Sequence, residues 1–448
     1  GDCRGRELAE AVGDANIIIT SGTPQFDREF FECKPEMKLV ARDGLGFNNV
    51  DVETARERGC FVTKVEKSVE REAVAECAVC EMIDLIRKIW LGIRAVDSNR
   101  WLDRGQFVGF ELRNRTVGIV GCGNIAAVHA AVLTAQKDTE LVGVADIHFE
   151  KAQDYAERFH TKPYASLEEM IEKEQPDVLH VCTPHYLHVP MTQYALERGI
   201  NVFMEKPPAI TFAQLDQLKQ AVYASKAKLG LCYQNRYNPS YREAKEFIAS
   251  GAAGKVLGAR GLVTWNRPAP YYTQSEWRGK LATEGGGVLI NQAVHTLDLL
   301  SDLLGRPDWI DASLSNHHLK GLIEVEDTLE AYIRFGEKVA CFYATNAYCA
   351  DVPPLIEISC EKVTVRIEDL DVSYRYPDGT ITKPEVGRPV PIGKSYWGSG
   401  HTACIGDFYK ALENNTDFAL ELPVLENSIR LMLGAYESAR EHHVVEFS

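Results

Sequence analysis

The sequence predicts an α/β protein with three parts: a Rossmann-type parallel sheet, an α+β region with a large, mostly antiparallel sheet, and an extra N-terminal α/β region. Apolar runs alternate with helical patterns in the first half of the chain, a glycine-rich turn lies near residue 121, and longer strands dominate beyond residue 237. We expect domains at residues 1–112, 113–236 and 237–448. A chain of 448 residues fits this division, because a domain averages roughly 150 residues.

The N-terminal region combines short strands with helices. Residues 16–20 and 37–41 are short apolar runs of the kind that form buried strands. Residues 72–94 have the apolar periodicity of one long amphipathic helix. We therefore expect this region to form an α/β domain of its own.

The central region alternates strands and helices at a spacing typical of a parallel sheet covered on both faces. Strands are expected at residues 116–120, 141–145, 178–182 and 201–204. Helices are expected after the glycine turn, at residues 150–159 and 167–174, and in a segment that ends near residue 199.

The C-terminal region contains longer strands with fewer helices between them, which indicates a sheet with one solvated face. These strands are expected at residues 256–265, 328–335, 339–348, 355–360 and 364–368. A helix is expected over residues 424–439, because Pro423 is a typical start signal.

The composition argues against several classes of protein. The net charge of −15, without a Lys/Arg block, argues against nucleic acid binding. No apolar run approaches the roughly 20 residues of a membrane helix, and the charged start of the sequence does not resemble a signal peptide. The scattered cysteines, among them Cys182 and Cys341 in apolar runs, are typical of reduced core residues in a cytoplasmic protein. No second pair completes a zinc site with Cys77 and Cys80, so we expect no metal.

A dinucleotide-binding turn is the clearest motif in the central region. Gly121-x-Gly123-x-x-Ala126 follows a strand and opens a helix, which permits a tight turn, close approach of a pyrophosphate and close packing of helix on strand. Asp146 ends the next strand, where its carboxylate can accept hydrogen bonds from the ribose hydroxyls and would repel a 2′-phosphate. The sequence therefore predicts NAD rather than NADP.

A lysine follows the last expected strand of this sheet. Glu205-Lys206-Pro207 comes directly after residues 201–204, at the carboxyl end where open α/β sheets bind ligands. Partial desolvation of Lys206 would lower its pKa into a range useful for proton transfer.

These motifs occur together in one known family. Residues 116 to 448 resemble the glucose–fructose oxidoreductase / inositol dehydrogenase (Gfo/Idh/MocA) family. The matching features are the glycine turn, Thr183-Pro184 with His188, Glu205-Lys206-Pro207, and the run from Gly285 to Asp298. The cofactor contacts expected from the turn and the resemblance are Gly121, Gly123, Asn124, Ile125, Asp146, Thr183, Pro184, His188, Glu205 and Lys206.

The resemblance implies that Lys206 and His295 are the catalytic residues, with His295 as the general acid/base. Histidine has a suitable intrinsic pKa for this task, and Asp298, three residues further along a helix, could orient its ring. Many members of the family carry Asp where this chain has Asn291. Asn cannot exchange a proton but can still bind a substrate hydroxyl.

Aromatic rings, amides and guanidinium groups suit a polyhydroxylated ligand. The expected substrate contacts are Asn235, Arg236, Trp265, Tyr272, Trp277, Arg278, Asn291, His295, Asp298 and His401.

The N-terminal region resembles another family. Residues 14–116 are similar to the substrate domain of D-2-hydroxyacid dehydrogenases of the phosphoglycerate type, with matching runs at residues 14–20, 38–51 and 111–121. We find no counterpart of that family's catalytic Arg, Glu and His, so the chain is interpreted as a fusion. The N-terminal region is expected to act as a scaffold or dimerisation module, or alternatively to sense a carboxylate ligand.

The expected function is NAD-dependent hydride transfer to or from a secondary alcohol of a sugar, polyol or sugar derivative, in a homo-oligomer. Two alternatives remain open from the sequence. A tightly held NAD could serve transient oxidation during glycoside cleavage or epimerisation, or the chain could be a non-catalytic, ligand-responsive binding protein.

Overall fold

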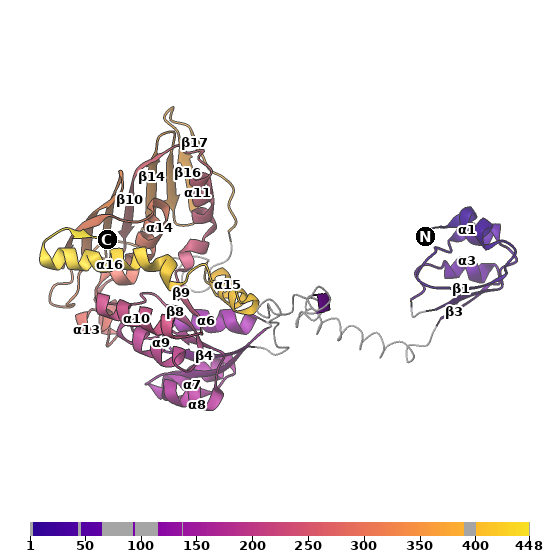
Figure 1. Ribbon diagram of the computed structural model, residues 1–448, viewed down its shortest axis with the longest axis horizontal. Helices are drawn as coiled ribbons and strands as arrows, with labels where there is room; N and C mark the ends of the chain where they lie inside the picture. The colour runs from indigo at the N-terminus through magenta and orange to yellow at the C-terminus, as the bar shows by residue number, and fades with distance from the viewer. Residues whose placement is uncertain are drawn as a thin grey trace. The chain divides into compact units, whose positions relative to one another are not determined.

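The computed structural model describes residues 3–43, 46–64, 93–94, 115–136, 138–388 and 400–447. The chain divides into two compact units, Gly1–Leu112 and Arg113–Ser448, which are described separately here (Figure 1). The helix expected over residues 72–94 lies almost entirely outside the described residues. No helix in the described ranges is long and apolar enough to cross a membrane.

The first unit is built on a small parallel sheet. Its strands β1 (Ile17–Thr20), β2 (Leu39–Arg42) and β3 (Phe61–Lys64) pair in that order, which confirms the two strands expected from the sequence. The accompanying helices are α1 (Gly5–Val12), α2 (Arg28–Cys33) and α3 (Val52–Glu57). Asp27 and Asp51 cap α2 and α3 by accepting hydrogen bonds from backbone N–H groups. Buried Phe26, Phe30 and Phe31 form the centre of its core.

The second unit begins with the Rossmann sheet. Its strands are β4 (Arg115–Val120), β5 (Thr139–Ala145), β6 (Pro163–Tyr164), β7 (Val178–Val181), β8 (Asn201–Glu205) and β9 (Leu229–Cys232). They pair in parallel in the order β6-β5-β4-β7-β8-β9. The helices of this region are α6 (Asn124–Ala135), α7 (Phe149–Phe159), α8 (Leu167–Glu174), α9 (His188–Leu196) and α10 (Phe212–Ala224). Because the order reverses between β4 and β7, a crevice for a ligand is expected at the carboxyl ends of these strands.

The remainder of the unit carries a larger sheet, in the order β17-β16-β15-β14-β10-β13-β12-β11-β18. The strands are β10 (Val256–Thr264), β11 (Trp309–Ser315), β12 (Thr328–Phe335), β13 (Lys338–Thr345), β14 (Leu355–Cys360), β15 (Thr364–Glu368), β16 (Asp371–Arg375), β17 (Ile381–Thr382) and β18 (Val445–Glu446). Among these described strands only β10 and β13 pair in parallel, so the mostly antiparallel sheet is confirmed.

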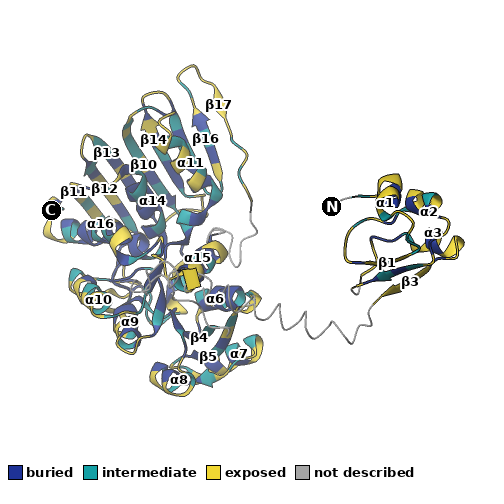
Figure 2. Cartoon of the chain, turned by 45° about the vertical axis from the view of Figure 1, so that its right-hand side comes forward, coloured by how far each residue is buried: buried dark blue, intermediate teal, exposed yellow. Residues whose placement is uncertain are grey.

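Helices cover one face of this sheet and leave the other more open (Figures 1 and 2). Helices α11 (Pro239–Ala249), α14 (Val294–Leu304) and α16 (Leu422–Glu441) contact its strands. Tyr332 on β12 is exposed, and so is Cys341 on β13. The expectation that Cys341 belongs to the core is therefore wrong: its side chain points to the uncovered face of an otherwise apolar strand.

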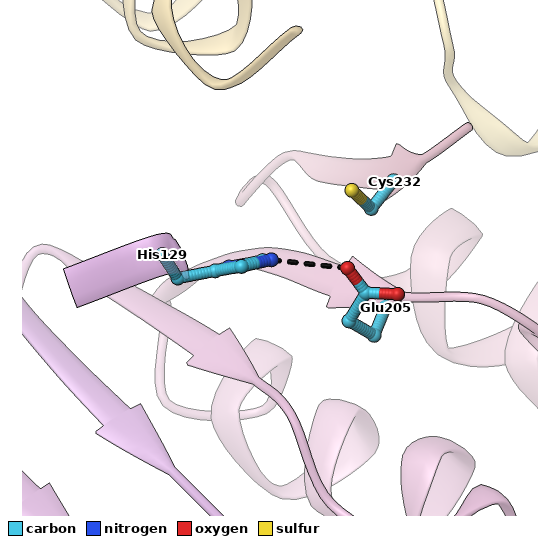
Figure 3. Close-up of side chains that lie close together, drawn as sticks. All are labelled: His129, Glu205 and Cys232. Carbon is cyan, nitrogen blue, oxygen red and sulfur yellow. Dashed lines mark hydrogen bonds and ion pairs between the residues drawn. The ribbon is translucent and has the colours of Figure 1, made fainter. Parts of the chain in front are cut away.

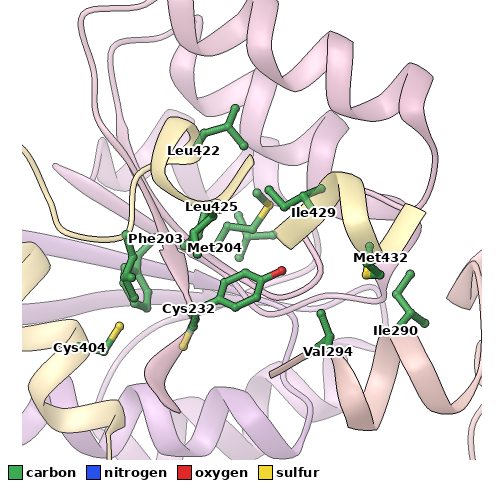
Figure 4. Close-up of a cluster of buried hydrophobic side chains, with 14 of the residues drawn as sticks. Phe203, Met204, Cys232, Ile290, Val294, Cys404, Leu422, Leu425, Ile429 and Met432 are labelled. Carbon is green, nitrogen blue, oxygen red and sulfur yellow. The ribbon is translucent and has the colours of Figure 1, made fainter. Parts of the chain in front are cut away.

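The two sheets of this unit share one hydrophobic core. Phe203 and Met204 on β8 lie near Val294 on α14 and Leu425 on α16 (Figure 4). Helix α15 (His401–Asn414) packs against both α6 and β9. The carboxyl end of the Rossmann sheet is consequently backed by C-terminal helices, which gives the side chains at this edge a rigid support.

Three consecutive glycines allow the chain to pass close to this core. A Cβ atom on Gly286 would lie 2.0 Å from the Tyr436 hydroxyl, and one on Gly287 would lie 1.9 Å from the Glu326 carbonyl oxygen. The Glu326 carboxylate in turn accepts hydrogen bonds from the Gly287 and Leu289 N–H groups and from the Tyr436 hydroxyl. A side chain at Gly287 would require the backbone to move, and one at Gly286 would displace the Tyr436 side chain.

We expect Gly287→Ala to lower the free energy of unfolding by about 1–3 kcal/mol, the usual cost of overpacking. Gly406→Ala is the matched control, because its Cβ would meet nothing closer than Gln136 Nε2 at 3.8 Å in a helix where Ala is favoured. Urea denaturation measures both variants. Equal stability of the two would contradict the close packing described here.

Candidate active site

The turn after β4 has the form that a dinucleotide requires. Gly121 has φ of 90°, and a Cβ there would lie 2.7 Å from the Cys182 carbonyl oxygen. Helix α6 begins at Asn124, and both Gly123 and Asn124 are exposed at its N-terminus. A Cβ at Gly123 would meet nothing within 4 Å, so the turn is open on its outer side. Backbone N–H groups and the helix dipole favour a phosphate there.

Asp146 is fixed beside this turn. Its Oδ2 accepts a hydrogen bond of 2.8 Å from the Cys122 N–H, and its Oδ1 accepts one of 2.9 Å from the His148 N–H. Each carboxylate oxygen can accept a further bond from a ribose hydroxyl. The position and acceptor-only chemistry of Asp146 fit NAD.

Thr183 and His188, two predicted cofactor contacts after β7, differ in whether their side chains are free to bind a ligand. Thr183 Oγ1 is buried and has no hydrogen-bond partner among the described residues, which leaves it available to a ligand. His188 is fully buried, and its nitrogens lie 2.7 Å from the Pro207 carbonyl oxygen and 2.9 Å from that of Thr183. The prediction that His188 contacts the cofactor is therefore wrong, because the ring ties two loops of the site together.

Lys206 lies where the sequence predicted, at the carboxyl end of β8. Its ammonium donates a hydrogen bond of 2.6 Å to the backbone carbonyl of Asn291, and the Lys206–Pro207 peptide bond is cis. Burial lowers the pKa of Lys206, with the charge of Arg278 adding to the effect and the Glu205 carboxylate opposing it. A lysine of this kind can exchange a proton more readily than a solvated one.

A chain of hydrogen bonds holds Glu205 beside this lysine. Glu205 Oε1 lies 3.0 Å from His129 Nε2 (Figure 3). His129 Nδ1 lies 2.8 Å from His180 Nδ1, and His180 Nε2 lies 3.0 Å from the Tyr409 hydroxyl. With both rings neutral, the Tyr409 hydroxyl can donate to His180, His180 can donate to His129, and His129 can donate to the Glu205 carboxylate. Burial alone would raise the pKa of Glu205, but the hydrogen bond from His129 and nearby positive charge hold it well below its usual range.

Glu205 was predicted to contact the cofactor, but the residue is only 5% exposed and its carboxylate faces the hydrogen-bond chain instead. The Sγ atom of Cys232 also lies within 4.8 Å of the ligand atoms of His129 and Glu205 (Figure 3). The hydrogen bond between His129 and Glu205 satisfies these two groups without an ion. Neither His129 nor His180 was singled out from the sequence, because only the fold brings them to Glu205.

His295 lies just after an irregular turn. Residues Leu289–Ala293 form a π-helical turn before α14, a distortion that is frequent at functional sites. The Nδ1 atom of His295 is buried without a partner among the described residues, while Nε2 lies 3.5 Å from Gln234 Nε2. Burial lowers the pKa of His295 to about 3, and the positive charge of Lys206 adds to this effect. The ring is therefore neutral near pH 7 and can accept a proton.

Asn291 lies next to an acidic residue that the sequence did not reveal. Glu284 is the last residue of α13 (Leu281–Glu284) and is 1% exposed. Its Oε1 atom accepts a hydrogen bond from Asn291 Nδ2. Its Oε2 accepts a bond of 2.5 Å from the Gly279 N–H, and burial raises its pKa to about 7. The only signal in the sequence is that this carboxylate directly precedes the three glycines.

Two predicted substrate residues form an ion pair instead. Arg236 donates to both carboxylate oxygens of Asp298, at 2.9 and 2.7 Å, and also to Asp302. Asp298 further accepts a hydrogen bond from Ser428 and is 2% exposed. The predictions that Asp298 orients His295 and that both residues contact substrate are therefore wrong, because the bidentate bond to Arg236 turns the carboxylate away.

Three further predicted substrate residues are buried among protein groups. The Trp265 Nε1 donates to the Val352 carbonyl oxygen, and the Tyr272 hydroxyl accepts from Asn346 Nδ2. His401 is 3% exposed, and burial lowers its pKa to about 4. A direct substrate contact is contradicted for Trp265 and Tyr272, because their polar atoms bond within the protein. Both ring nitrogens of His401 are buried without a partner among the described residues, so His401 stays available to a ligand.

The remaining predicted residues stay available to a ligand. Trp277 packs on the His185 ring at 4.8 Å, and the Arg278 guanidinium lies over the Trp277 and Tyr271 rings. Arg278 Nε and Asn235 Oδ1 are buried without hydrogen-bond partners among the described residues. Arg278 also acts electrostatically on Lys206 and Glu284, which places it at the same site.

The fold and the turn after β4 define an oxidoreductase with an NAD-binding Rossmann domain. The family model for the oxidoreductase family with an NAD-binding Rossmann fold matches residues 115–233, and the GFO/IDH/MocA C-terminal domain matches residues 241–366. The chain belongs to the Gfo/Idh/MocA family, as the sequence motifs predicted.

Individual relatives each match part of the chain. The chain is 32% identical to a D-glucoside 3-dehydrogenase of Escherichia coli over 43% of its length, and the match spans 54% of that relative. It is 34% identical to a glyoxylate reductase of Pyrococcus furiosus over 27% of its length, which spans 37% of that protein. The chain thus matches about half or less of these relatives. The WlbA dehydrogenase of Bordetella pertussis, solved with NADH and UDP-GlcNAcA, is 26% identical and has a TM-score of 0.66, covering 75% of this chain and 99% of that one.

Proposed function

We propose that the second unit catalyses reversible, NAD-linked oxidation of a secondary alcohol in a sugar, polyol or sugar derivative. The observation that carries this proposal is the half-buried Lys206, whose ammonium donates to the Asn291 carbonyl within the electrostatic reach of a neutral His295. NAD, when bound, supplies the acceptor for the hydride that leaves the carbinol carbon. The protein's own task is to bind the substrate, exclude water and take up the hydroxyl proton.

The proton-handling pair is expected to share one positive charge. The positive charge of Lys206 lowers the pKa of His295, so the pair carries its charge on Lys206 while the His295 ring stays neutral. When the substrate hydroxyl loses its proton to His295 as the carbonyl forms, Lys206 stabilises the developing negative charge on oxygen. Asn235, Trp277, Arg278 and Asn291 are proposed as the substrate contacts, and Thr183 with Pro184 as contacts to the cofactor.

The test is NADH absorbance with NAD⁺ and a panel of D-glucose, glucose 6-phosphate, methyl glucosides, myo-inositol and glucuronic acid. Net accumulation of NADH supports a dehydrogenase. Conversion of a glycoside without accumulation of NADH would favour transient oxidation by a retained cofactor, and no reaction with any of these compounds would count against the proposal.

Asp146→Ala is expected to weaken NAD(H) binding about tenfold or more, and to weaken NADP(H) binding less. The variant loses both the ribose acceptors and the bonds that fix the turn at Cys122 and His148, and a hydrogen bond to a charged group contributes about 1.5–3 kcal/mol. Fluorescence titration measures both cofactors. Tighter binding of NADP(H) than of NAD(H) to the unmodified protein would contradict the assigned role.

A further inference from the structure

Glu284 is a buried carboxylate for which the proposed reaction so far has no use. It is 1% exposed and forms no salt bridge within the described residues. Its two oxygens accept hydrogen bonds from the Gly279 N–H and from Asn291 Nδ2, and its backbone carbonyl lies 2.8 Å from His185 Nδ1. A buried carboxylate is costly unless its partners are well placed, so these contacts constrain the structure strongly.

The carboxylate determines which way the Asn291 amide points. Asn291 Nδ2 donates to Glu284 Oε1, the orientation that the ionised carboxylate requires because it can only accept hydrogen bonds. The Asn291 Oδ1 then faces away from Glu284, and it accepts no hydrogen bond from any residue that the structure describes. The same residue holds Lys206 through its backbone carbonyl. Asn291 therefore connects the buried carboxylate to the proton-handling lysine.

We infer that Glu284 and Asn291 form one carboxylate–amide unit, in which Glu284 positions the Asn291 carboxamide so that Oδ1 receives a hydrogen bond from a substrate hydroxyl. This inference rests on the proposed function, because it concerns the substrate of the same site. Glu284 is 1% exposed and both its oxygens accept bonds from the protein, so it acts as a positioning residue behind Asn291. The unit selects substrates that present a hydrogen-bond donor next to the reacting carbon, and it disfavours a carboxylate at that place.

Two single substitutions should each break the unit. In Glu284→Gln, the new Oε1 accepts from the Gly279 N–H and the new Nε2 faces the Asn291 Nδ2, so the Asn291 amide has to turn over and present a donor instead. In Asn291→Asp, two carboxylates face each other, and like charges at this distance cannot both remain ionised. We expect each variant to lower kcat/KM about ten- to hundredfold, because the hydrogen-bonding groups that position 291 presents to the substrate are changed.

The double variant Glu284→Gln/Asn291→Asp should restore the unit with the amide and the carboxylate exchanged between the two positions. The introduced glutamine can accept from the Gly279 N–H and donate to the introduced aspartate, whose other oxygen again offers an acceptor. We expect kcat/KM to return to within a few-fold of the unmodified protein, the strong non-additivity that residues in direct contact show. Glu324→Gln is the matched control, since this exposed carboxylate accepts from the Leu281 N–H at the other end of α13 and is expected to change nothing.

The measurement is kcat and KM for the best substrate of the sugar panel, with melting temperatures for all four variants. Loss in both single variants and recovery in the double variant support the unit. An unchanged Glu284→Gln, or a folded double variant no better than the worse single one, would overturn it. If a single variant fails to fold, the double variant decides alone: recovered turnover supports the unit, and an unfolded or inactive double variant refutes it. Activity that survives the loss of Lys206 and His295 would instead reject the proposed function, so the two failures are distinct.

Discussion

Lys206→Ala and His295→Ala are each expected to lower kcat about 10²–10⁴-fold, the usual contribution of a positioned acid/base. Lys206 loses its ammonium beside the Asn291 carbonyl, and His295 loses the ring whose Nδ1 is buried without a partner among the described residues. Affinity for NAD should change little, because the turn from Gly121 to Asn124 and the Asp146 carboxylate are untouched. Steady-state kinetics with the best sugar of the panel measures the loss.

The double variant tests whether the two residues act as one relay. The Lys206 charge lowers the pKa of His295, and if the two residues work as one relay, removing the second should cost little more than removing the first. Full additivity of the two losses would mean that they act in separate steps. Gln214→Ala is a suitable control, because this residue serves the start of α10 and touches neither group.

Glu205→Ala is expected to lower the free energy of unfolding by about 3–5 kcal/mol, the usual cost of removing one partner from a buried charged pair. The substitution leaves Lys206 without its nearest negative charge and leaves the donor chain from Tyr409 through His180 and His129 without its final acceptor. Denaturant titration measures the change in stability.

Glu169→Ala provides the comparison for Glu205→Ala. Glu169 pairs with Lys173 on the surface of α8, and such exposed pairs contribute about 0–1 kcal/mol. If Glu205→Ala were as mild as Glu169→Ala, the hydrogen-bond chain would not be the support that the structure indicates.

The sequence predicted those parts of the site that depend on local pattern. The strand, turn and helix around Gly121 lie within a few residues of each other, and Lys206 follows a strand whose carboxyl end defines its place in any parallel sheet. The large sheet was also predictable, because its strands have the length and alternation of an antiparallel arrangement. These features require no knowledge of contacts that are distant in the sequence.

The residues that the sequence missed act through long-range contacts. His129 meets Glu205 across 76 positions of the sequence, and Tyr409 meets His180 across 229. Asp298 was assigned to His295 from helical spacing, but Arg236 offers a charged, bidentate partner that spacing cannot reveal. Glu284 illustrates the same limit, because only the folded chain shows that its carboxylate faces Asn291.

The most direct test of the active site is single-turnover hydride transfer, monitored as NADH formation after excess protein and NAD⁺ are mixed with the best sugar of the panel. We expect a rapid phase in the unmodified protein, and a phase slowed about 10²–10⁴-fold in both Lys206→Ala and His295→Ala, with NAD affinity retained. Near-normal rates in both variants would contradict the account, because the chemistry would then take place elsewhere on the chain.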